Sequence, residues 1–198
     1  MIFIYHQKID KVWYAAAIEN DKIFATAFSP NNEEEASRHL LSNLPYNIPF
    51  QVTEKPRQLL AELLKTLKAI FDGKGVSRSS FKTSMDHLPS YMRRVLSCTS
   101  LIPVGYLTTY GAIAKVAGGS PRSVGGTEAS NPFPLLIPCH RVVRADFTIG
   151  GYGLGEKIKL QILRREDRNY EETTILKIND KALPLFPVKH LRKNRGKK

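Results

Sequence analysis

Cysteine is scarce in this 198-residue sequence, which has only Cys98 and Cys139. Two cysteines so far apart do not form a disulfide framework, and neither belongs to a Cys-x-x-Cys pair of the kind that holds structural zinc. We therefore expect no metal and no cofactor. We also expect an intracellular, cytoplasmic protein, because a free thiol persists in a reducing compartment.

Long apolar runs are also missing. The chain begins with apolar residues, but Lys8, Asp10 and Lys11 follow soon after. We expect this beginning to be too short and too charged for a signal peptide or a membrane-spanning helix. The sequence therefore predicts no membrane partner.

Acidic residues are outnumbered by basic ones, 18 to 30, which gives a net charge of +12. Such a balance indicates a polyanionic partner, with nucleic acid the first candidate, although a generally basic surface would give the same number. Part of the charge lies in residues 189–198, which contain six Lys or Arg residues and no acid. A tail of this kind is often a disordered end.

The first part of the chain is typical of a small α/β domain. Aromatic and β-branched runs predict strands, and leucines at helical spacing predict helices. The strands are expected at residues 2–5, 12–18 and 23–28, and the helices at 33–41 and 56–71. A stretch rich in Gly, Ser and Lys, residues 72–84, indicates a domain boundary.

The second part of the chain contains a candidate helix-turn-helix. Thr109 can cap a helix over residues 110–117, and two glycines close it. Ser120, followed by a proline, opens another helix, which should end before Asn131 because residues that precede proline avoid helical geometry. Further helices are expected at residues 88–98 and 156–167. Many small helical hairpins of this kind bind nothing, so the pattern alone is weak.

The hexapeptide PCHRVV places Cys139 directly before His140. A thiol becomes a good nucleophile when a neighbouring group takes its proton, and a histidine base usually needs a carboxylate to orient it. Glu156, Glu166 and Asp167 of the last helix are all candidates, and position alone does not choose among them. The same pair could instead be a small buried thiol and a hydrogen-bonded core histidine.

This hexapeptide resembles the active-site signature of the O6-alkylguanine-DNA alkyltransferases, a family of direct-reversal DNA repair proteins. Four other segments resemble the family's first helix-turn-helix helix, recognition helix, Asn turn and Gly-rich active-site loop, in the family's order. They are residues 109–114, 120–125, 131–134 and 149–153. The resemblance covers roughly residues 88–167, and the N-terminal half is similar only in layout.

The resemblance implies an α/β fold in two domains. The N-terminal domain, residues 1–80, would be ribonuclease H-like, with a small antiparallel sheet and helices. The C-terminal domain, residues 81–170, would be mostly helical and winged-helix-like, and would carry the helix-turn-helix. Residues 171–198 would form an extension with the basic tail.

The resemblance also implies a reaction. Cys139 would attack the alkyl carbon on the guanine exocyclic oxygen and keep it as a thioether, so each molecule reacts once. His140 would take the thiol proton through a bound water molecule, with Glu166 as its orienting carboxylate. Asn131 would hold the turn, and Tyr110 would crowd the target phosphate and give a proton to the leaving guanine.

The implied partner is double-stranded DNA containing O6-alkylguanine, and also O4-alkylthymine less well, bound by a monomer. An alkylated base is stacked in the duplex, so it must be flipped out, and Arg122 would fill the gap. The main-chain carbonyls of Cys139 and Val142 would accept from the guanine amino group, and the main-chain N–H of Gly153 would donate to the alkylated oxygen. The expected substrate-binding residues are Tyr110, Arg122, Val142, Val143, Tyr152 and Gly153, and the expected DNA-binding residues are Thr109, Tyr110, Ser120, Arg122, Ser123, Gly125 and Arg141.

Three other interpretations compete with this one. A non-enzymatic lesion-binding relative would flip the same base but would lack the acceptor cysteine, which is present here. A plain helix-turn-helix regulator would need neither the Cys-His pair nor the Gly-rich loop. A Cys-His hydrolase would need a second half of its site that the sequence does not show.

Overall fold

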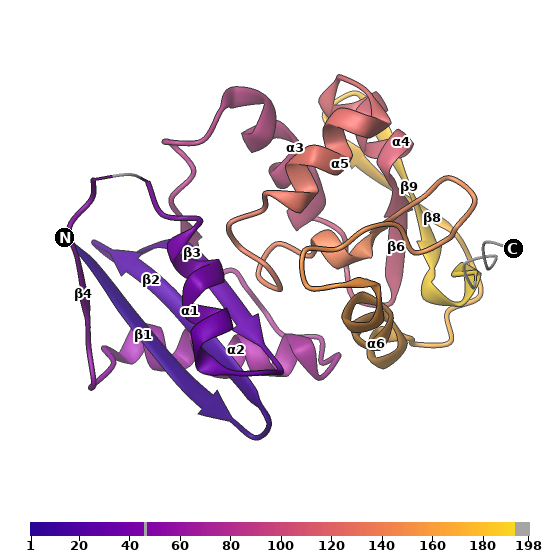
Figure 1. Cartoon of the computed structure of the whole chain (residues 1–198). Coiled ribbons are helices and arrows are strands. Elements are labelled where there is room, and N and C mark those ends of the chain that lie inside the picture. The colour runs from indigo at the N-terminus through magenta and orange to yellow at the C-terminus, as the bar shows by residue number, and fades with distance from the viewer. Residues whose placement is uncertain (46, 193–198) are drawn as a thin grey trace, which may run out of the picture. The chain divides into compact units, whose positions relative to one another are not determined.

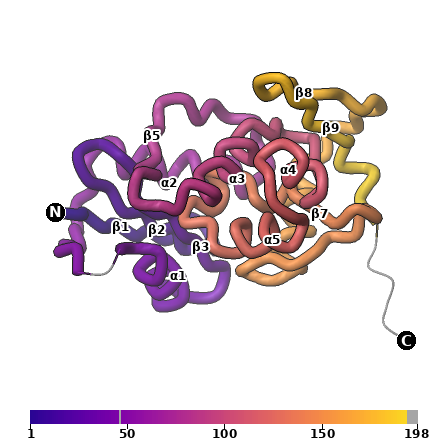
Figure 2. Tube along the Cα trace, turned by 90° about the horizontal axis from the view of Figure 1, so that it is seen from above, coloured from indigo at the N-terminus to yellow at the C-terminus, as the bar shows by residue number. Residues whose placement is uncertain are grey.

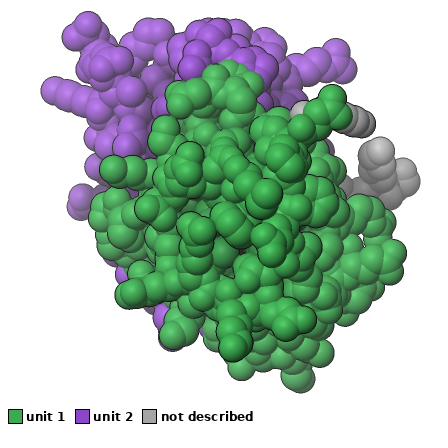
Figure 3. Space-filling view, turned by 90° about the vertical axis from the view of Figure 1, so that its left-hand side faces the viewer, with its two compact units in different colours: residues 1–71, 76–88, 132–136 green, residues 72–75, 89–131, 137–198 purple. Residues whose placement is uncertain are grey.

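A computed structural model describes residues 1–45 and 47–192 of the chain. The chain divides into two compact units, which Figure 3 distinguishes by colour. Unit 1 comprises residues 1–71, 76–88 and 132–136, and unit 2 comprises residues 72–75, 89–131 and the chain from 137 onward. Unit 1 therefore includes residues 81–88 and 132–136 from beyond residue 80, and unit 2 includes residues 72–75 from before it. The tail residues 193–198 lie outside the described residues.

Unit 1 is built on a sheet with strand order β4-β1-β2-β3-β5 (Figure 1). The strands are β1 Ile2–Ile9, β2 Val12–Glu19, β3 Lys22–Ser29, β4 Phe50–Val52 and β5 Lys82–Thr83. The central three are antiparallel, and the two short edge strands pair in parallel with β1 and β3. The turns at Asp10 and Asn20 have positive φ, a conformation that Asn and Asp adopt more readily than most residues.

Two helices cover this sheet, α1 Glu33–Leu41 and α2 Gln58–Phe71. Ala15 and Ala17 of β2 pack with Leu40 of α1, whereas Tyr14 contacts Phe71 of α2. Because successive side chains of a strand point to opposite faces, α1 and α2 cover opposite faces of the sheet. The predicted strands and helices of residues 1–71 are confirmed, within a few residues at their ends.

Unit 2 contains α3 Ser90–Ser100, α4 Tyr110–Ala117, α5 Pro121–Ala129 and α6 Glu156–Glu166. The first three pack together, as Figure 2 shows. Thr109 caps α4 by accepting a hydrogen bond from the Ala112 N–H at 3.1 Å, and Ser120 and Ser123 form a capping box on α5. The predicted helix-turn-helix is therefore confirmed, including its caps.

The second sheet has the order β7-β6-β9-β8. Its strands are β6 Tyr106–Thr109, β7 Val142–Val143, β8 Thr174–Ile178 and β9 Lys181–Pro187. The hairpin β8–β9 turns at Asn179, which has a φ of 51°, and β9 pairs antiparallel with β6. Residues 174–187, which the sequence analysis placed in an extension, are therefore part of the unit 2 sheet.

The described chain is thus an α/β protein with two sheets and six α-helices. Among its described residues, no helix has both the length and the apolar character needed to cross a bilayer.

Candidate active site

Cys139 begins a short 3₁₀ turn, Cys139–Arg141, that leads directly into β7. β7 pairs in parallel with β6, with Thr108 opposite Val142, and β6 leads into α4. The Asn131 side-chain amide donates a hydrogen bond to the Ile137 carbonyl at 3.0 Å. The sheet and this amide together fix the cysteine turn against the helix-turn-helix.

A cavity of about 400 Å³ opens beside the cysteine. Its walls come from α4, α5, the cysteine turn and the Gly-rich loop before α6. The lining residues are Tyr110, Pro121, Gly125, Glu128, Ala129, Cys139, Arg144, Gly151, Tyr152 and Gly153. Four segments distant in sequence therefore converge on one thiol.

A buried hydrogen-bonded cluster lies behind the cysteine turn. The His140 Nε2 atom is 3.0 Å from Glu166 Oε1. Arg141 donates to both oxygens of that carboxylate, at 2.9 and 2.7 Å, and to the Ile102 carbonyl at 2.5 Å. Of the three carboxylates that the sequence left open, Glu166 is the one that meets His140. Arg141, expected on the DNA-binding face, is instead buried, because its guanidinium pairs with Glu166.

The charge state of this cluster follows from its partners. Burial alone would raise the pKa of Glu166, but the hydrogen bonds and charges of His140 and Arg141 lower it to about 2. Burial lowers the pKa of His140, against the opposing pull of Glu166. Burial thus favours the neutral imidazole, in which the Nε2–H donates to the anionic Glu166. The other ring nitrogen, Nδ1, is buried and has no hydrogen-bond partner within the described part of the chain.

Cys139 is almost fully buried, with 5% of the residue exposed. Burial raises its pKa to about 12, and the nearby Glu128 carboxyl raises it further, while a hydrogen bond from Asn131 and the charge of Lys159 oppose the shift. The resting site therefore holds a protonated thiol.

Lys159 of α6 is a buried cation beside this site that the sequence analysis did not single out. Its Nζ donates to the Val142 carbonyl at 2.6 Å and lies within 3.4 Å of the Tyr110 hydroxyl and the Gly151 carbonyl. Burial lowers the pKa of Lys159 to about 8, against the attraction of Cys139 and Glu128. The sequence did contain a signal for Lys159, because it lies three residues before Ile162 on the apolar face of α6. Lysine is rarely fully buried, so a lysine on that face indicates a special role.

Glu128 of α5 was also missed. It is 7% exposed and lines the cavity. Burial raises the pKa of Glu128 to about 7, and a hydrogen bond from Thr99 partly offsets this. A glutamate on the inner face of a short helix was the only sequence signal.

The remaining expected residues fall into three groups. Tyr110, Tyr152, Gly153 and Gly125 line the cavity, whereas Val142 and Val143 turn their side chains into apolar cores and leave only main-chain groups for a substrate. On the outside, Arg122 and Ser123 are exposed in the first turn of α5. Burial raises the pKa of Tyr110 to about 12, so its hydroxyl keeps its proton.

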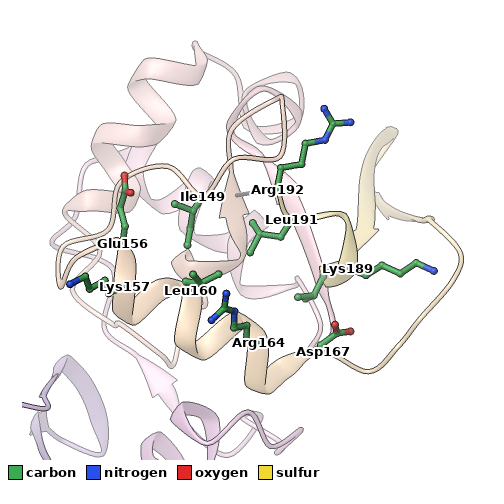
Figure 4. A pocket seen from close by; sticks show the side chains of 10 residues that line it. Ile149, Glu156, Lys157, Leu160, Arg164, Asp167, Lys189, Leu191 and Arg192 are labelled. Carbon is green, nitrogen blue, oxygen red and sulfur yellow. The ribbon is translucent and has the colours of Figure 1, made fainter. Parts of the chain in front are cut away.

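A second cavity, of about 510 Å³, lies beside α6 (Figure 4). Ile149, Leu160 and Leu191 gather at its centre, while the side chains of Lys189 and Arg192 extend outward. Among the described residues its lining contains no cysteine or histidine, so we do not assign chemistry to it. No group of His, Cys, Asp or Glu side chains within the described part of the chain could hold a metal ion.

Comparison with known proteins agrees with this geometry. Residues 90–168 match the family model for the DNA-binding domain of 6-O-methylguanine DNA methyltransferase. A methylated-DNA–protein-cysteine methyltransferase of Methanothermobacter thermautotrophicus is 41% identical over 116 residues, 59% of this chain and 66% of that protein. Its namesake from Archaeoglobus fulgidus is 38% identical over 113 residues, 54% of this chain and 74% of that protein.

The fold has a solved counterpart as well. The crystal structure of the O6-methylguanine-DNA methyltransferase of Pyrococcus kodakaraensis superposes with a TM-score of 0.63 at 24% identity. The superposition covers 84% of this chain and 99% of that one. At this identity the likeness concerns the fold.

The fold and the site together define a two-unit α/β protein that holds a buried cysteine behind a helix-turn-helix. The chain belongs to the methylated-DNA–protein-cysteine methyltransferase family. It spans just under two thirds of the length of the first of these relatives and about three quarters of the second.

Proposed function

We propose that this protein repairs DNA by moving an alkyl group from the O6 atom of guanine onto the Cys139 sulfur. The observation that carries the proposal is the cavity beside Cys139, whose floor is a protonated thiol and whose walls include the recognition helix α5. A stacked base cannot reach a buried thiol, so the target nucleotide has to leave the duplex.

The reaction is a displacement at the alkyl carbon. The Cys139 Sγ–C bond forms as the C–O6 bond breaks, and the thiol proton finally resides on the departing guanine. His140 Nδ1 is the available base, because Nε2 donates to Glu166. We infer that a single water molecule links this nitrogen to the thiol. The product thioether is stable, so each molecule acts once.

The cavity supplies further groups for the flipped base. The Tyr110 hydroxyl keeps its proton and can donate it as negative charge develops on guanine. The main-chain carbonyls of Cys139 and Val142 and the N–H of Gly153 are available at the walls, where Tyr152 also lies. Arg122, exposed in the first turn of α5, would fill the space that the base leaves in the stack.

DNA would be held by the first turns of α4 and α5. Helix N-termini present unpaired N–H groups to phosphates, and basic side chains add a salt-dependent attraction. We assign this role to Thr109, Tyr110, Ser120, Arg122, Ser123 and Gly125. Arg141 is left out because its donors are used inside the protein. We also infer that the protein acts as an intracellular monomer.

The same reasoning extends to the fold. We infer that unit 1 is a variant of the ribonuclease H-like fold and that unit 2 is a variant of the winged helix. The antiparallel β1–β2–β3 core supports the first inference. The hairpin β8–β9 following the helix-turn-helix supports the second.

Mass spectrometry tests the reaction directly. The protein is mixed with a duplex carrying one O6-methylguanine, and the intact mass and tryptic peptides are measured. We expect one added methyl group on the peptide containing Cys139, and none with Cys139→Ser. Tight binding without a mass change would assign the chain to lesion sensing, and binding that ignores the lesion would favour a helix-turn-helix regulator.

A further inference from the structure

The outer face of α6 carries exposed positive charge beside an apolar side chain. Lys157 and Arg164 are exposed and lie about two helical turns apart, with the half-buried Leu160 between them (Figure 4). The inner face of the same helix is packed, since Ile162 and Leu163 are fully buried. The outer three side chains are therefore free to meet another molecule.

The same three side chains line two cavities. The cavity of about 510 Å³ has an apolar wall of Ile149, from the start of the Gly-rich loop, and of Val188 and Leu191, from the segment that follows β9. A second cavity, of about 390 Å³, is completed by Gln161 and Arg165. We refer to the three outer side chains and these two cavities together as the α6 face.

Positive charge predominates around the α6 face. Its lining contains five basic and two acidic residues, Lys157, Arg164, Arg165, Lys189, Arg192, Glu156 and Asp167. Lys189 pairs with Glu171, whereas Lys157, Arg164 and Arg192 have no ion pair with any acidic residue in the described ranges. Three unpaired cations around apolar hollows are complementary to an acidic occupant with apolar side chains.

Other parts of this chain do not have that character. A second copy carries the same net charge of +12, and residues 193–198 contain four basic residues and no acidic one. Duplex DNA has the right charge, but a phosphate backbone would leave the apolar walls of the cavities uncovered. An acidic segment of another protein satisfies both requirements, because an amphipathic peptide buries its apolar side chains in a groove while its polar face meets the rim.

The α6 face lies away from the helix-turn-helix. Val142 of β7 packs in one apolar cluster with Ile113 of α4, whereas the next residue, Val143, packs in another with Leu163 of α6. Because successive side chains of a strand point to opposite faces, the second sheet separates α6 from the helix-turn-helix. Figure 1 shows the same separation, with α4 and α5 above α6. An occupant of the α6 face would leave the helix-turn-helix accessible.

We propose that the α6 face binds an acidic, amphipathic segment of another protein. Apolar side chains of that segment enter the cavities beside Leu160, and its carboxylates meet Lys157 and Arg164. This interaction goes beyond the proposed repair reaction and requires none of its catalytic groups.

A synthetic peptide tests the proposal. The probe is a fluorescein-labelled peptide of about 16 residues, or about 24 Å as a helix, with leucines at helical spacing and glutamates elsewhere. A scrambled peptide of the same composition, whose leucines share no face, shows what charge alone achieves. Fluorescence anisotropy is measured with the full chain, as wild type and as Lys157→Glu, Arg164→Glu and Leu160→Asn. Lys65→Glu, at an exposed lysine of α2, changes the net charge equally and is the matched control.

We expect saturable binding of the amphipathic peptide, about tenfold weaker binding of the scrambled one, and about tenfold weaker binding of the amphipathic peptide to each α6 variant, the loss typical of an important interface residue. Lys65→Glu should bind as the wild type does. The two charge reversals lie at exposed positions, so they remain informative if Leu160→Asn is poorly folded. No saturation, equal binding of both peptides, or equal affinities for Arg164→Glu and Lys65→Glu would overturn the proposal.

A labelled, unmodified DNA duplex is titrated in parallel. Arg164→Glu and Lys65→Glu should bind it with equal affinity, because they alter the net charge by the same amount. A loss of DNA affinity confined to Arg164→Glu would mean that the α6 face holds phosphates, and the proposal would be wrong. Neither titration involves alkyl transfer, so failure of the repair reaction would leave this result unaffected.

Discussion

The His140 Nε2 atom lies 3.0 Å from Glu166 Oε1, and neither side chain is exposed. Arg141 binds both oxygens of the same carboxylate and pairs its charge, while burial favours the neutral form of His140. The imidazole is held with Nε2–H toward Glu166, which leaves Nδ1 as its basic nitrogen. The carboxylate thus orients the ring and selects its tautomer.

Replacing Glu166 by Gln should disrupt this arrangement. The variant leaves the buried Arg141 guanidinium without its counter-charge, and breaking a buried pair in this way costs about 3–5 kcal/mol. We expect the urea midpoint to fall accordingly, and transfer by the remaining folded protein to slow at least about tenfold, because the imidazole loses its fixed tautomer. Glu172→Gln is the control. Wild-type stability and rate in Glu166→Gln would show that the cluster has no such role.

Cys139 should react slowly with soluble thiol reagents. Burial raises the pKa of its thiol to about 12, and the thiolate is the reactive form. In a Cys98→Ser background, labelling by a disulfide reagent at pH 7.5 should be far slower in the folded protein than in denaturant, and should accelerate as pH rises. Labelling at the rate of a free cysteine would mean that the site is open and the thiol ionised.

Glu128 should make stability fall with increasing pH. The pKa of its carboxyl is raised from 4.5 to about 7 in the folded protein, so its favourable contribution is complete below pH 4.5 and is lost as pH rises through 7. The difference corresponds to about 3 kcal/mol. Urea unfolding of Glu128→Gln should therefore decline less between pH 5 and 8 than unfolding of the wild type. Parallel pH profiles for the two proteins would contradict the assignment.

Arg122→Ala should weaken the reaction with duplex DNA more than the reaction with free O6-methylguanine base. Arg122 is exposed in the first turn of α5, where it can fill a vacated stack but cannot touch the thiol. We expect the transfer rate with duplex DNA to fall at least about tenfold, which corresponds to one or two kcal/mol. The rate with the free base should change little. Arg38→Ala, an exposed arginine of unit 1, is the control. Equal losses on both substrates would exclude a role in flipping.

Short sequence patterns were sufficient to predict most helices and strands of the fold. Thr109 and Ser120 cap α4 and α5 where their side chains predict caps, because an N-cap depends on only three or four consecutive residues. The same holds for the leucine stripe of α2. The pairing of β6 with β9 was not predicted, because it joins residues some eighty positions apart. Pro184 and Pro187 argue against a strand at the position of β9. Asn179 and Asp180, however, are typical turn residues and lie between β8 and β9.

The residues of the site also separate into those that the sequence predicts and those that only the packed structure reveals. The PCHRVV hexapeptide located Cys139 and His140, and the family resemblance selected Glu166 from three carboxylates. Lys159 and Glu128 could not be assigned, because a charged residue on a helix shows its partners only after distant segments pack around it. Arg141 was misplaced for a related reason: a basic residue in a DNA-binding context suggests a phosphate contact, and only packing reveals the buried carboxylate that it serves.

The pairing of β9 with β6 also determines where the chain can be truncated. β6 has β7 and the cysteine turn on one side and the β8–β9 hairpin on the other. A fragment ending at residue 168, where the family match ends, would expose a row of unpaired N–H and C=O groups along β6, and such an open edge recruits strands from other molecules. The hairpin therefore covers the open edge of the strand that supports Cys139, and its removal is expected to promote aggregation.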